Sequence, residues 1–126
     1  MSLFDYYEPE PAQSCPVCGS RLVEWQGKDA ECAMLVWRQG CHHPVGQKVD
    51  SDIAIADLES LNNSLPSRFL IYSFDCKCPF PVTAECTTEH EVWNNCQVIT
   101  ADNVKQWPEE RRREYKKRLA WLRGSS

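Results

Sequence analysis

Eight cysteines in a chain of 126 residues constrain this protein more than any other feature of its sequence. A chain of this length usually forms one domain with a single core, and hydrophobic residues make up 42% of it, which excludes global disorder. The thiols are therefore not required to replace a missing core, and their chemistry is the first question. The cysteines are Cys15, Cys18, Cys32, Cys41, Cys76, Cys78, Cys86 and Cys96.

The N-terminal segment indicates the compartment in which these thiols work. Residues 1–11 contain no Lys or Arg and no apolar run, so they lack the features of a secretory signal peptide. The longest strongly apolar run, residues 33–37, is far shorter than the roughly 20 residues of a membrane-spanning helix. We therefore expect a cytoplasmic protein with no membrane segment, in which reducing conditions favour metal ligation over disulfides.

The most specific motif is Cys15-Pro-Val-Cys18-Gly19. Two thiolates three positions apart on a tight turn can hold one zinc ion, and a glycine after the second cysteine lets the backbone turn toward the sulfurs. The motif resembles the zinc knuckle, the half-site of zinc ribbons and rubredoxin-like domains. A hairpin is expected after such a knuckle, and the sequence from Ser20 to Gly27 fits one strand and its turn.

The second half of the expected metal site departs from the ribbon pattern. A ribbon supplies a second Cys-x-x-Cys after about 15 to 20 residues, whereas this chain offers only Cys76-Lys-Cys78-Pro79 much further along. We expect Cys15, Cys18, Cys76 and Cys78 to form one structural, tetrahedral zinc site, with a disulfide or unliganded thiols as the alternatives. The reserve ligands are Cys41, His42, His43 and Cys86.

Other roles for the thiols are weaker predictions. Cys32, Cys86 and Cys96 lie within strand-like patterns, and free cysteine often packs as a small hydrophobe. A thiol redox protein that uses Cys15 and Cys18 is an alternative, but such pairs usually open a helix, whereas a strand is expected here. Cys41 beside His42 and His43 is the one local nucleophile-and-base combination, and the histidines are more typical of a solvated loop.

The first half of the chain predicts a lead-in and a hairpin. Residues 1–14 are acidic and rich in proline, and we assign them no regular structure. Residues 21–25 and 32–38 are rich in Leu, Val and Trp and flank the turn-forming residues 26–29, which predicts a β-hairpin. Residues 39–46 form a loop.

The second half predicts a helix followed by a meander. Residues 49–57 alternate as in a strand, but the spacing of Ile55, Leu58 and Leu61 favours a helix from about Ser51 to Asn63. That helix would be capped by Asp50 or Ser51. Residues 68–74, 82–86 and 91–99 predict three consecutive strands, with a turn at 87–90.

These elements predict an α+β fold, with an antiparallel sheet of about five strands and a central helix, stabilised by zinc. We expect an α+β domain at residues 15–104 and an amphipathic basic helix at residues 105–126 that packs on it. Within the tail, Pro108 opens a helix with acids in its first turn and bases later. Tyr115, Leu119 and Leu122 form its narrow apolar stripe.

Charge is unevenly distributed along the chain. Residues 1–107 carry 7 basic and 15 acidic side chains, a balance of −8, whereas residues 108–126 carry 7 and 3, a balance of +4. An acidic body repels phosphate and attracts basic surfaces, whereas a basic helix does the reverse. The densest acidic group consists of Asp50, Asp52, Asp57 and Glu59, and the densest basic group begins with Arg111, Arg112 and Arg113.

The sequence therefore favours a non-catalytic, zinc-stabilised domain that binds a protein with a basic surface. Small acidic α+β proteins of this kind resemble the inhibitor and immunity proteins of basic toxins, a class-level likeness of size and charge. The alternative is a nucleic-acid-binding, zinc-ribbon-like protein that uses its C-terminal helix. Phosphate-binding loops and the common hydrolase and deaminase motifs do not occur in the sequence, so an enzyme is the weaker expectation.

Overall fold

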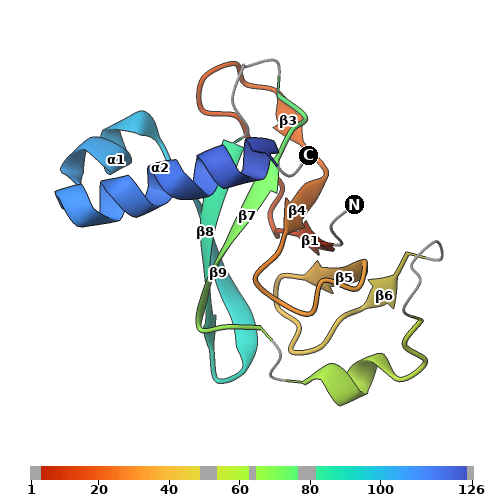
Figure 1. The fold of residues 1–126 in the computed structure, drawn as a ribbon. Coiled ribbons are helices and arrows are strands. Elements are labelled where there is room, and N and C mark those ends of the chain that lie inside the picture. The colour runs from red at the N-terminus through yellow and green to blue at the C-terminus, as the bar shows by residue number, and fades with distance from the viewer. Residues whose placement is uncertain (1–3, 49–53, 63–64, 77–81, 125–126) are drawn as a thin grey trace. The chain divides into compact units, whose positions relative to one another are not determined.

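The chain folds into two compact units that match its two charge zones. The computed structural model describes residues 4–48, 54–62, 65–76 and 82–124 (Figure 1). Leu3–Val98 forms the first unit, and Ile99–Ser126 belongs to the second. The first holds 6 basic and 14 acidic residues, a balance of −8, and the second holds 8 and 4, a balance of +4.

The first unit consists of a seven-stranded sheet and a small two-stranded sheet. The large sheet has the strand order β6-β5-β1-β4-β7-β8-β9, and the small one pairs β2 with β3. The strands are β1 (Asp5–Glu8), β2 (Gln13–Ser14), β3 (Arg21–Leu22), β4 (Trp25–Gly27), β5 (Leu35–Arg38), β6 (Gly46–Gln47), β7 (Arg68–Ser73), β8 (Val82–Glu89) and β9 (Val92–Val98).

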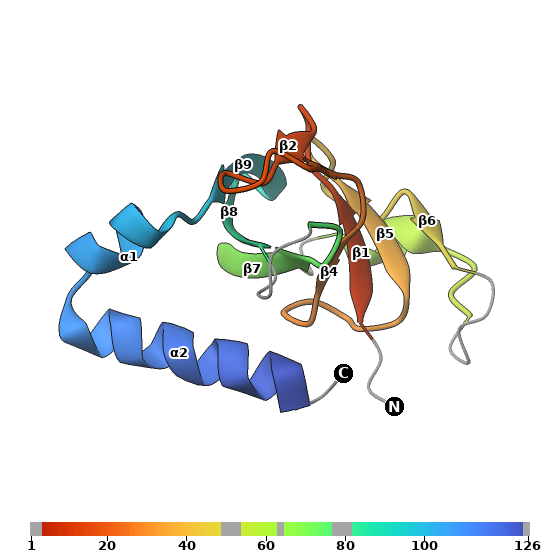
Figure 2. The ribbon, with the colours of Figure 1, turned by 90° about the horizontal axis from the view of Figure 1, so that it is seen from above.

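The large sheet curls into a half-barrel around aromatic side chains (Figure 2). Tyr7 of β1 and Trp93 of β9 stand four places apart in the strand order, yet their ring centroids are 5.8 Å apart. Phe69 of β7 lies 5.5 Å from Tyr7 and 5.6 Å from Trp93. All three are fully buried, so their packing across the concave face holds the curl.

Hydrogen bonds also join the loop after β5 to β9 across the open side of the half-barrel. Gly40 donates its N–H to the carbonyl of Trp93, and Trp93 donates its own to the carbonyl of Cys41. The side chain of Gln39 donates to the carbonyl of Asn94. The loop at 39–41 therefore covers part of the backbone of β9, which ends the sheet order.

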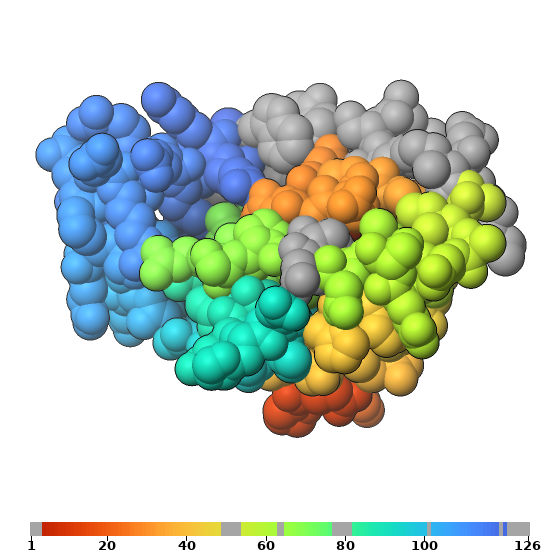
Figure 3. Space-filling model, turned by 90° about the horizontal axis from the view of Figure 1, so that it is seen from below, coloured from red at the N-terminus to blue at the C-terminus, as the bar shows by residue number. Residues whose placement is uncertain are grey.

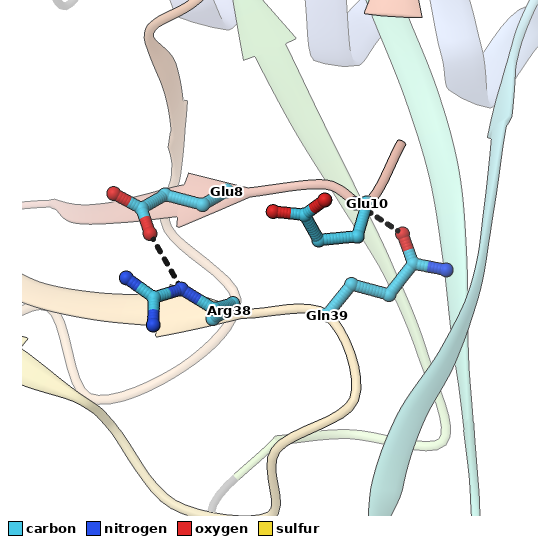
Figure 4. Close-up of polar contacts among 4 residues, drawn as sticks. All are labelled: Glu8, Glu10, Arg38 and Gln39. Carbon is cyan, nitrogen blue, oxygen red and sulfur yellow. Dashed lines mark hydrogen bonds and ion pairs between the residues drawn. The ribbon is translucent and has the colours of Figure 1, made fainter. Parts of the chain in front are cut away.

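The N-terminal segment is part of the sheet, so the expectation that residues 1–14 lack regular structure was wrong. β1 lies between β4 and β5, antiparallel to the first and parallel to the second. Figure 4 shows two contacts along the parallel pair: Glu8 forms an ion pair with Arg38 at 3.0 Å, and the N–H of Glu10 donates to the side chain of Gln39. The alternation of buried and half-buried residues in β1 fits a strand packed on one face.

The insertion of β1 also overturns the predicted hairpin of residues 21–25 and 32–38. The predicted strand at 21–25 is divided between β3 of the small sheet and β4, and β4 includes residues 26 and 27 of the predicted turn. β4 and β5 each pair with β1 and not with the other. The sheet has seven strands, and it is mixed because β1 and β5 run parallel. The expected sheet of about five strands, all antiparallel, was therefore wrong in both size and strand direction. The hydrophobic pattern of these strands could be seen in the sequence, whereas their pairing depends on β1, which is distant in the chain.

Gly27 of β4 permits a close approach of β1 and β7, and this predicts a stability difference between two glycines. A Cβ on Gly27 would lie 2.8 Å from a ring carbon of Tyr7 and 3.1 Å from the carbonyl oxygen of Leu70. Gly27→Ala should therefore lower the free energy of unfolding by about 1–3 kcal/mol. Gly46→Ala is the matched control, because its Cβ would meet nothing closer than Val36 at 3.9 Å. Equal urea midpoints for the two variants would contradict this packing.

The predicted central helix is reduced to one 3₁₀ turn, Leu58–Leu61, preceded from residue 54 to 57 by irregular chain. The rest of the predicted helix, including its caps Asp50 and Ser51, lies outside the described residues or in irregular chain. Leu58 and Leu61 still pack against the core, as the periodicity predicted. The N–H of Ile55 donates to the side chain of Gln47, and Figure 3 shows this yellow-green segment lying against residues 40–48.

The meander of β7, β8 and β9 is confirmed. Six residue pairs join β7 to β8, and six join β8 to β9. The turn between β8 and β9 lies two residues later than predicted, at His90 and Glu91, both of which have positive φ. Two-residue turns with positive φ match the twist of paired strands, and β8 extends to Glu89, three residues beyond the predicted strand 82–86.

The second unit contains two helices, α1 (Ala101–Gln106) and α2 (Glu109–Gly124). The helix at the tail is confirmed, and Pro108 accepts its first hydrogen bond, from Arg112. α1 was not predicted, although Thr100 and Asn103 form a capping box at its start. The side chains of Leu119 and Leu122, in the predicted stripe, lie outside the described residues. Neither of these helices, as far as it is described, has the length and apolar content needed to cross a bilayer.

Candidate metal and partner site

The Cys15–Gly19 motif forms a tight turn between β2 and β3. These two short strands pair antiparallel, with Ser14 opposite Arg21. The N–H of Cys15 donates to the carbonyl of Ser20 at 2.8 Å, and the N–H of Gly19 donates to the carbonyl of Cys15 at 3.0 Å. The motif is thus closed by its own backbone, as the resemblance to a knuckle implied.

The backbone of this turn also faces a sulfur. The N–H of Cys18 donates to Sγ of Cys15 at 3.5 Å. Gly19 has φ +75°, a conformation that a residue with a Cβ rarely adopts. In metal sites, hydrogen bonds to the ligand atoms orient them toward the ion.

The two cysteines of the turn have different surroundings. Cys15 is buried and belongs to the hydrophobic core. Cys18 is exposed, and its Sγ lies 3.1 Å from the hydroxyl of Ser20. One sulfur is therefore held by the core and the other faces outward.

The chain that leads to Cys76 is tied to the strand that follows the turn. The carboxylate of Asp75 accepts the N–H of Val23 at 2.9 Å and that of Glu24 at 2.7 Å. Val23 directly follows β3, which is paired with β2 next to Cys15. Cys76 is partly buried against the same core that contains Cys15.

The fourth predicted ligand, Cys78, lies outside the described residues, so the complete set is not described. Within the described ranges, no three His, Cys, Asp or Glu side chains lie together as a metal site. Cys15, Cys18 and Cys76 are all described, so these three predicted ligands do not form such a group, and the four-cysteine site stays a prediction.

The reserve ligands have other contacts. Nδ1 of His42 hydrogen-bonds the side chain of Asn62, and Nδ1 of His43 lies 2.8 Å from the carbonyl oxygen of Pro44. The two rings stack edge to face. Cys41 lies in the loop that bonds to β9, and Cys86 lies within β8 opposite Cys96. None of the contacts named for these four residues involves the Cys15–Gly19 turn.

Cys32 is not a simple packing residue. It has φ +58°, and its Sγ donates to the carbonyl of Lys28 at 3.3 Å. Burial raises the pKa of its thiol, and the nearby carboxylate of Asp5 adds to this shift. The thiol therefore remains protonated at neutral pH and is a poor metal ligand.

Asp5 is a buried, hydrogen-bonded residue that the sequence did not single out. Its carboxylate is fully buried and accepts four hydrogen bonds from the segment at residues 32–37. Isolated buried carboxylates are strongly unfavourable, so this one is stable only because the donors surround it. The donors are the backbone N–H groups of Cys32, Ala33 and Leu35 and the indole of Trp37.

The conformation of residues 32–34 depends on this carboxylate. Cys32 and Met34 both have positive φ, near +58°, which is unfavourable for residues with side chains. In this conformation successive N–H groups converge on one anion. The signal in the sequence was a lone aspartate two residues ahead of Tyr7, in the lead-in at residues 1–14 that was predicted to lack regular structure.

The predicted partner-binding acids are only partly described. Asp57 and Glu59 are both exposed, next to the 3₁₀ turn. Asp50 and Asp52 lie outside the described residues. The two described acids therefore face solvent, where they are available to a partner.

The predicted basic residues lie on α2. Arg111 places its guanidinium 3.9 Å from the centre of the Trp107 ring, and that ring meets Tyr115 edge to face. Arg113 forms an exposed ion pair with Glu109. Arg111 and Arg112 are partly buried, so Arg113 is the most exposed of the three predicted arginines.

Exposed hydrophobic side chains occur in the Cys15–Gly19 turn and in the two segments that Asp75 joins. Among the described residues, the large hydrophobic side chains with the greatest exposure are Val17 at 84%, Val23 at 72% and Phe74 at 53%. Val17 lies inside the turn, and Val23 and Phe74 flank the contacts of Asp75. We call these three residues the apolar rim.

Comparison of the chain with protein-family models, with curated proteins and with solved structures gives no match. The site is therefore interpreted from its own geometry and chemistry.

Proposed function

We propose that this chain is a non-catalytic, zinc-stabilised domain that binds a protein with a basic surface, in the manner of an inhibitor or immunity protein. One observation carries the proposal. The Asp75 carboxylate ties the segment ending at Cys76 to the residues that directly follow β3, and the exposed side chains of the apolar rim lie in the Cys15–Gly19 turn and on these two segments.

The zinc part of the proposal follows from the donor set. Cys15, Cys18, Cys76 and Cys78 would supply four thiolates, which zinc prefers in closed tetrahedral sites. A closed shell leaves no position for substrate, so the ion would be structural. It would join two segments of chain that, in the described residues, are held by the hydrogen bonds of Asp75.

The binding part of the proposal follows from the apolar rim and the charge. Exposed apolar side chains gathered in one region are typical of interaction sites. The unit that carries the rim has a balance of −8. A partner with an apolar contact surrounded by Lys and Arg would complement both features, and Asp57 and Glu59 would add to its attraction.

Single substitutions in the rim test this surface. Phe74→Ser should reduce by at least 90% the amount of a basic protein that the chain captures from the native host's extract, because it removes a large apolar contact. The captured protein is then purified, and its binding to each variant is measured by calorimetry. Val45→Ser is the matched control, since Val45 is 37% exposed but lies in the loop at residues 40–45.

The charge dependence separates this function from its alternative. Asp57→Lys with Glu59→Lys should slow association with the purified partner several-fold at low salt, because it removes attraction at long range. Neutralising Arg111, Arg112 and Arg113 should leave that binding unchanged. A partner that binds Phe74→Ser as tightly as the unmodified chain would overturn the proposed surface.

A second candidate function, nucleic-acid binding by α2, is favoured by one observation. The basic charge is concentrated in its own compact unit, and there Arg111 stacks on Trp107 as cations and aromatic rings do in single-strand binding sites. Fluorescence anisotropy with labelled single-stranded DNA and RNA tests it. Salt-sensitive binding that is lost when the three arginines become glutamine would support this alternative.

A further inference from the structure

Two cysteines outside the proposed zinc site lie directly opposite each other in the β8–β9 hairpin. Cys86 of β8 pairs with Cys96 of β9 in an antiparallel register, so both side chains lie on the same face of the sheet. Both are free thiols. Cys86 is fully buried, and Cys96 is partly exposed.

The hairpin holds the two thiols within reach of a bond. Side chains directly opposite each other in antiparallel strands have Cβ atoms about 4.5–5.5 Å apart, and a disulfide needs about 3.5–4.5 Å. Cys86 and Cys96 are direct partners in this register. Closing the bond therefore requires only a small approach of two strands whose register at this pair is set by the turn at His90 and Glu91 together with the shift between Thr87 and Thr88.

The two sulfurs differ in reactivity. The hydrogen bond from the Cys86 thiol lowers the pKa of Cys96, whereas burial raises the pKa of Cys86, and its contact with Cys96 adds to the rise. The thiolate, not the thiol, attacks a disulfide. Cys96, which is also the more exposed of the two, is thus the attacking sulfur, and Cys86 is placed to resolve the product.

We propose that Cys86 and Cys96 are a thiol–disulfide exchange site, which a small disulfide such as oxidised glutathione converts into a cross-strand disulfide. The Cys96 thiolate attacks one glutathione sulfur, forms a mixed disulfide and releases one glutathione thiolate. Cys86 then attacks the Cys96 sulfur and passes its proton to the departing glutathione sulfur, so the second glutathione leaves as a thiol. The protein loses two protons and two electrons, and the oxidant becomes two reduced glutathione molecules.

This reaction would link the last strand of the sheet covalently to its neighbour. β9 ends the sheet order, and it leads at Val98 into the second unit. A bond between residues 86 and 96 would hold β9 in register in the oxidised protein. The site shares no residue with the four cysteines assigned to zinc, so a negative result for one proposal does not decide the other.

The test uses the full chain, oxidised glutathione as the probe, and mass spectrometry after alkylation. Incubation at pH 8 should yield a peptide pair joined through Cys86 and Cys96, with a mass two hydrogens lower than the reduced pair. Cys86→Ser should instead stop at the mixed disulfide, with one glutathione on residue 96. Cys96→Ser should leave Cys86 unmodified, because the buried thiol is not accessible to the probe.

Each outcome decides the proposal. A joined peptide pair together with the adduct in Cys86→Ser supports it. The absence of that pair at an excess of oxidised glutathione would overturn it, as would equal modification of Cys86 in the Cys96→Ser variant. Thermal unfolding of both serine variants checks that they fold, and Cys41→Ser controls for a cysteine outside the hairpin.

Discussion

Replacing Asp5 with alanine should lower the free energy of unfolding by about 4 kcal/mol, the largest effect expected of any single side chain in the first unit. The change leaves four donors buried without their acceptor. It also removes the anion that offsets the positive φ of Cys32 and Met34. Chemical denaturation followed by tryptophan fluorescence measures the loss, because Trp37 is one of the donors.

The matched control is another acid of the same strand. Glu8 forms an exposed ion pair with Arg38, with side chains 45% and 51% exposed, so Glu8→Ala should cost less than about 1 kcal/mol. Asp5→Asn should fall between the two, since its amide retains one acceptor but loses the charge. Similar denaturation midpoints for the Asp5 and Glu8 alanine variants would contradict the role given to the buried carboxylate.

Removal of zinc should lower the melting temperature by at least about 10 °C. A ligand that saturates the folded state a thousandfold above its dissociation constant contributes about 4 kcal/mol. For chains near this length each kcal/mol corresponds to about 2–8 °C. Differential scanning calorimetry with and without a zinc chelator, under reducing conditions, measures the shift.

Two cysteine variants provide the control for the zinc prediction. Cys18→Ser removes a ligand from an exposed position, so little packing is lost and any large change reflects the metal. It should melt near the temperature of the chelated protein and no longer respond to the chelator. Cys41→Ser should keep the full response. A Cys18→Ser variant that melts and responds like the unmodified chain would oppose a zinc ligand at this position.

The parts of the fold that could be predicted from the sequence were those set by local pattern. The strand at residues 68–73 is rich in aromatic and branched side chains, and the meander follows it without interruption. The helix of the tail begins directly after Pro108 and has acids in its first turn. In each case neighbouring residues contain the information.

The parts that could not be predicted depend on contacts between distant segments. β1 is only four residues long and lies in a proline-rich stretch, and it becomes a strand because β4 and β5 flank it. The helical spacing of Ile55, Leu58 and Leu61 places these residues on the core, but only one 3₁₀ turn forms. Periodicity thus identified the buried face without deciding the backbone conformation.

The candidate site also has one part that local sequence predicted and other parts that depend on distant residues. The turn at Cys15–Gly19 was predicted from five residues, and its backbone contacts agree with a knuckle. The tie through Asp75 could not be predicted, because it joins residues about 50 positions apart. The pairing of Cys86 with Cys96 was also missed, since it depends on where the turn falls and on the register shift between Thr87 and Thr88.

The most direct test of the proposed zinc centre is its metal content together with its thiol count. Native mass spectrometry of the freshly purified, reduced chain should show one zinc ion per molecule. Alkylation without denaturation should spare Cys15, Cys18, Cys76 and Cys78, and all eight cysteines should react after chelation and unfolding. A chain that carries no zinc after purification in zinc-containing buffer, and whose Cys18 and Cys78 react as fast as a free thiol, would contradict the account.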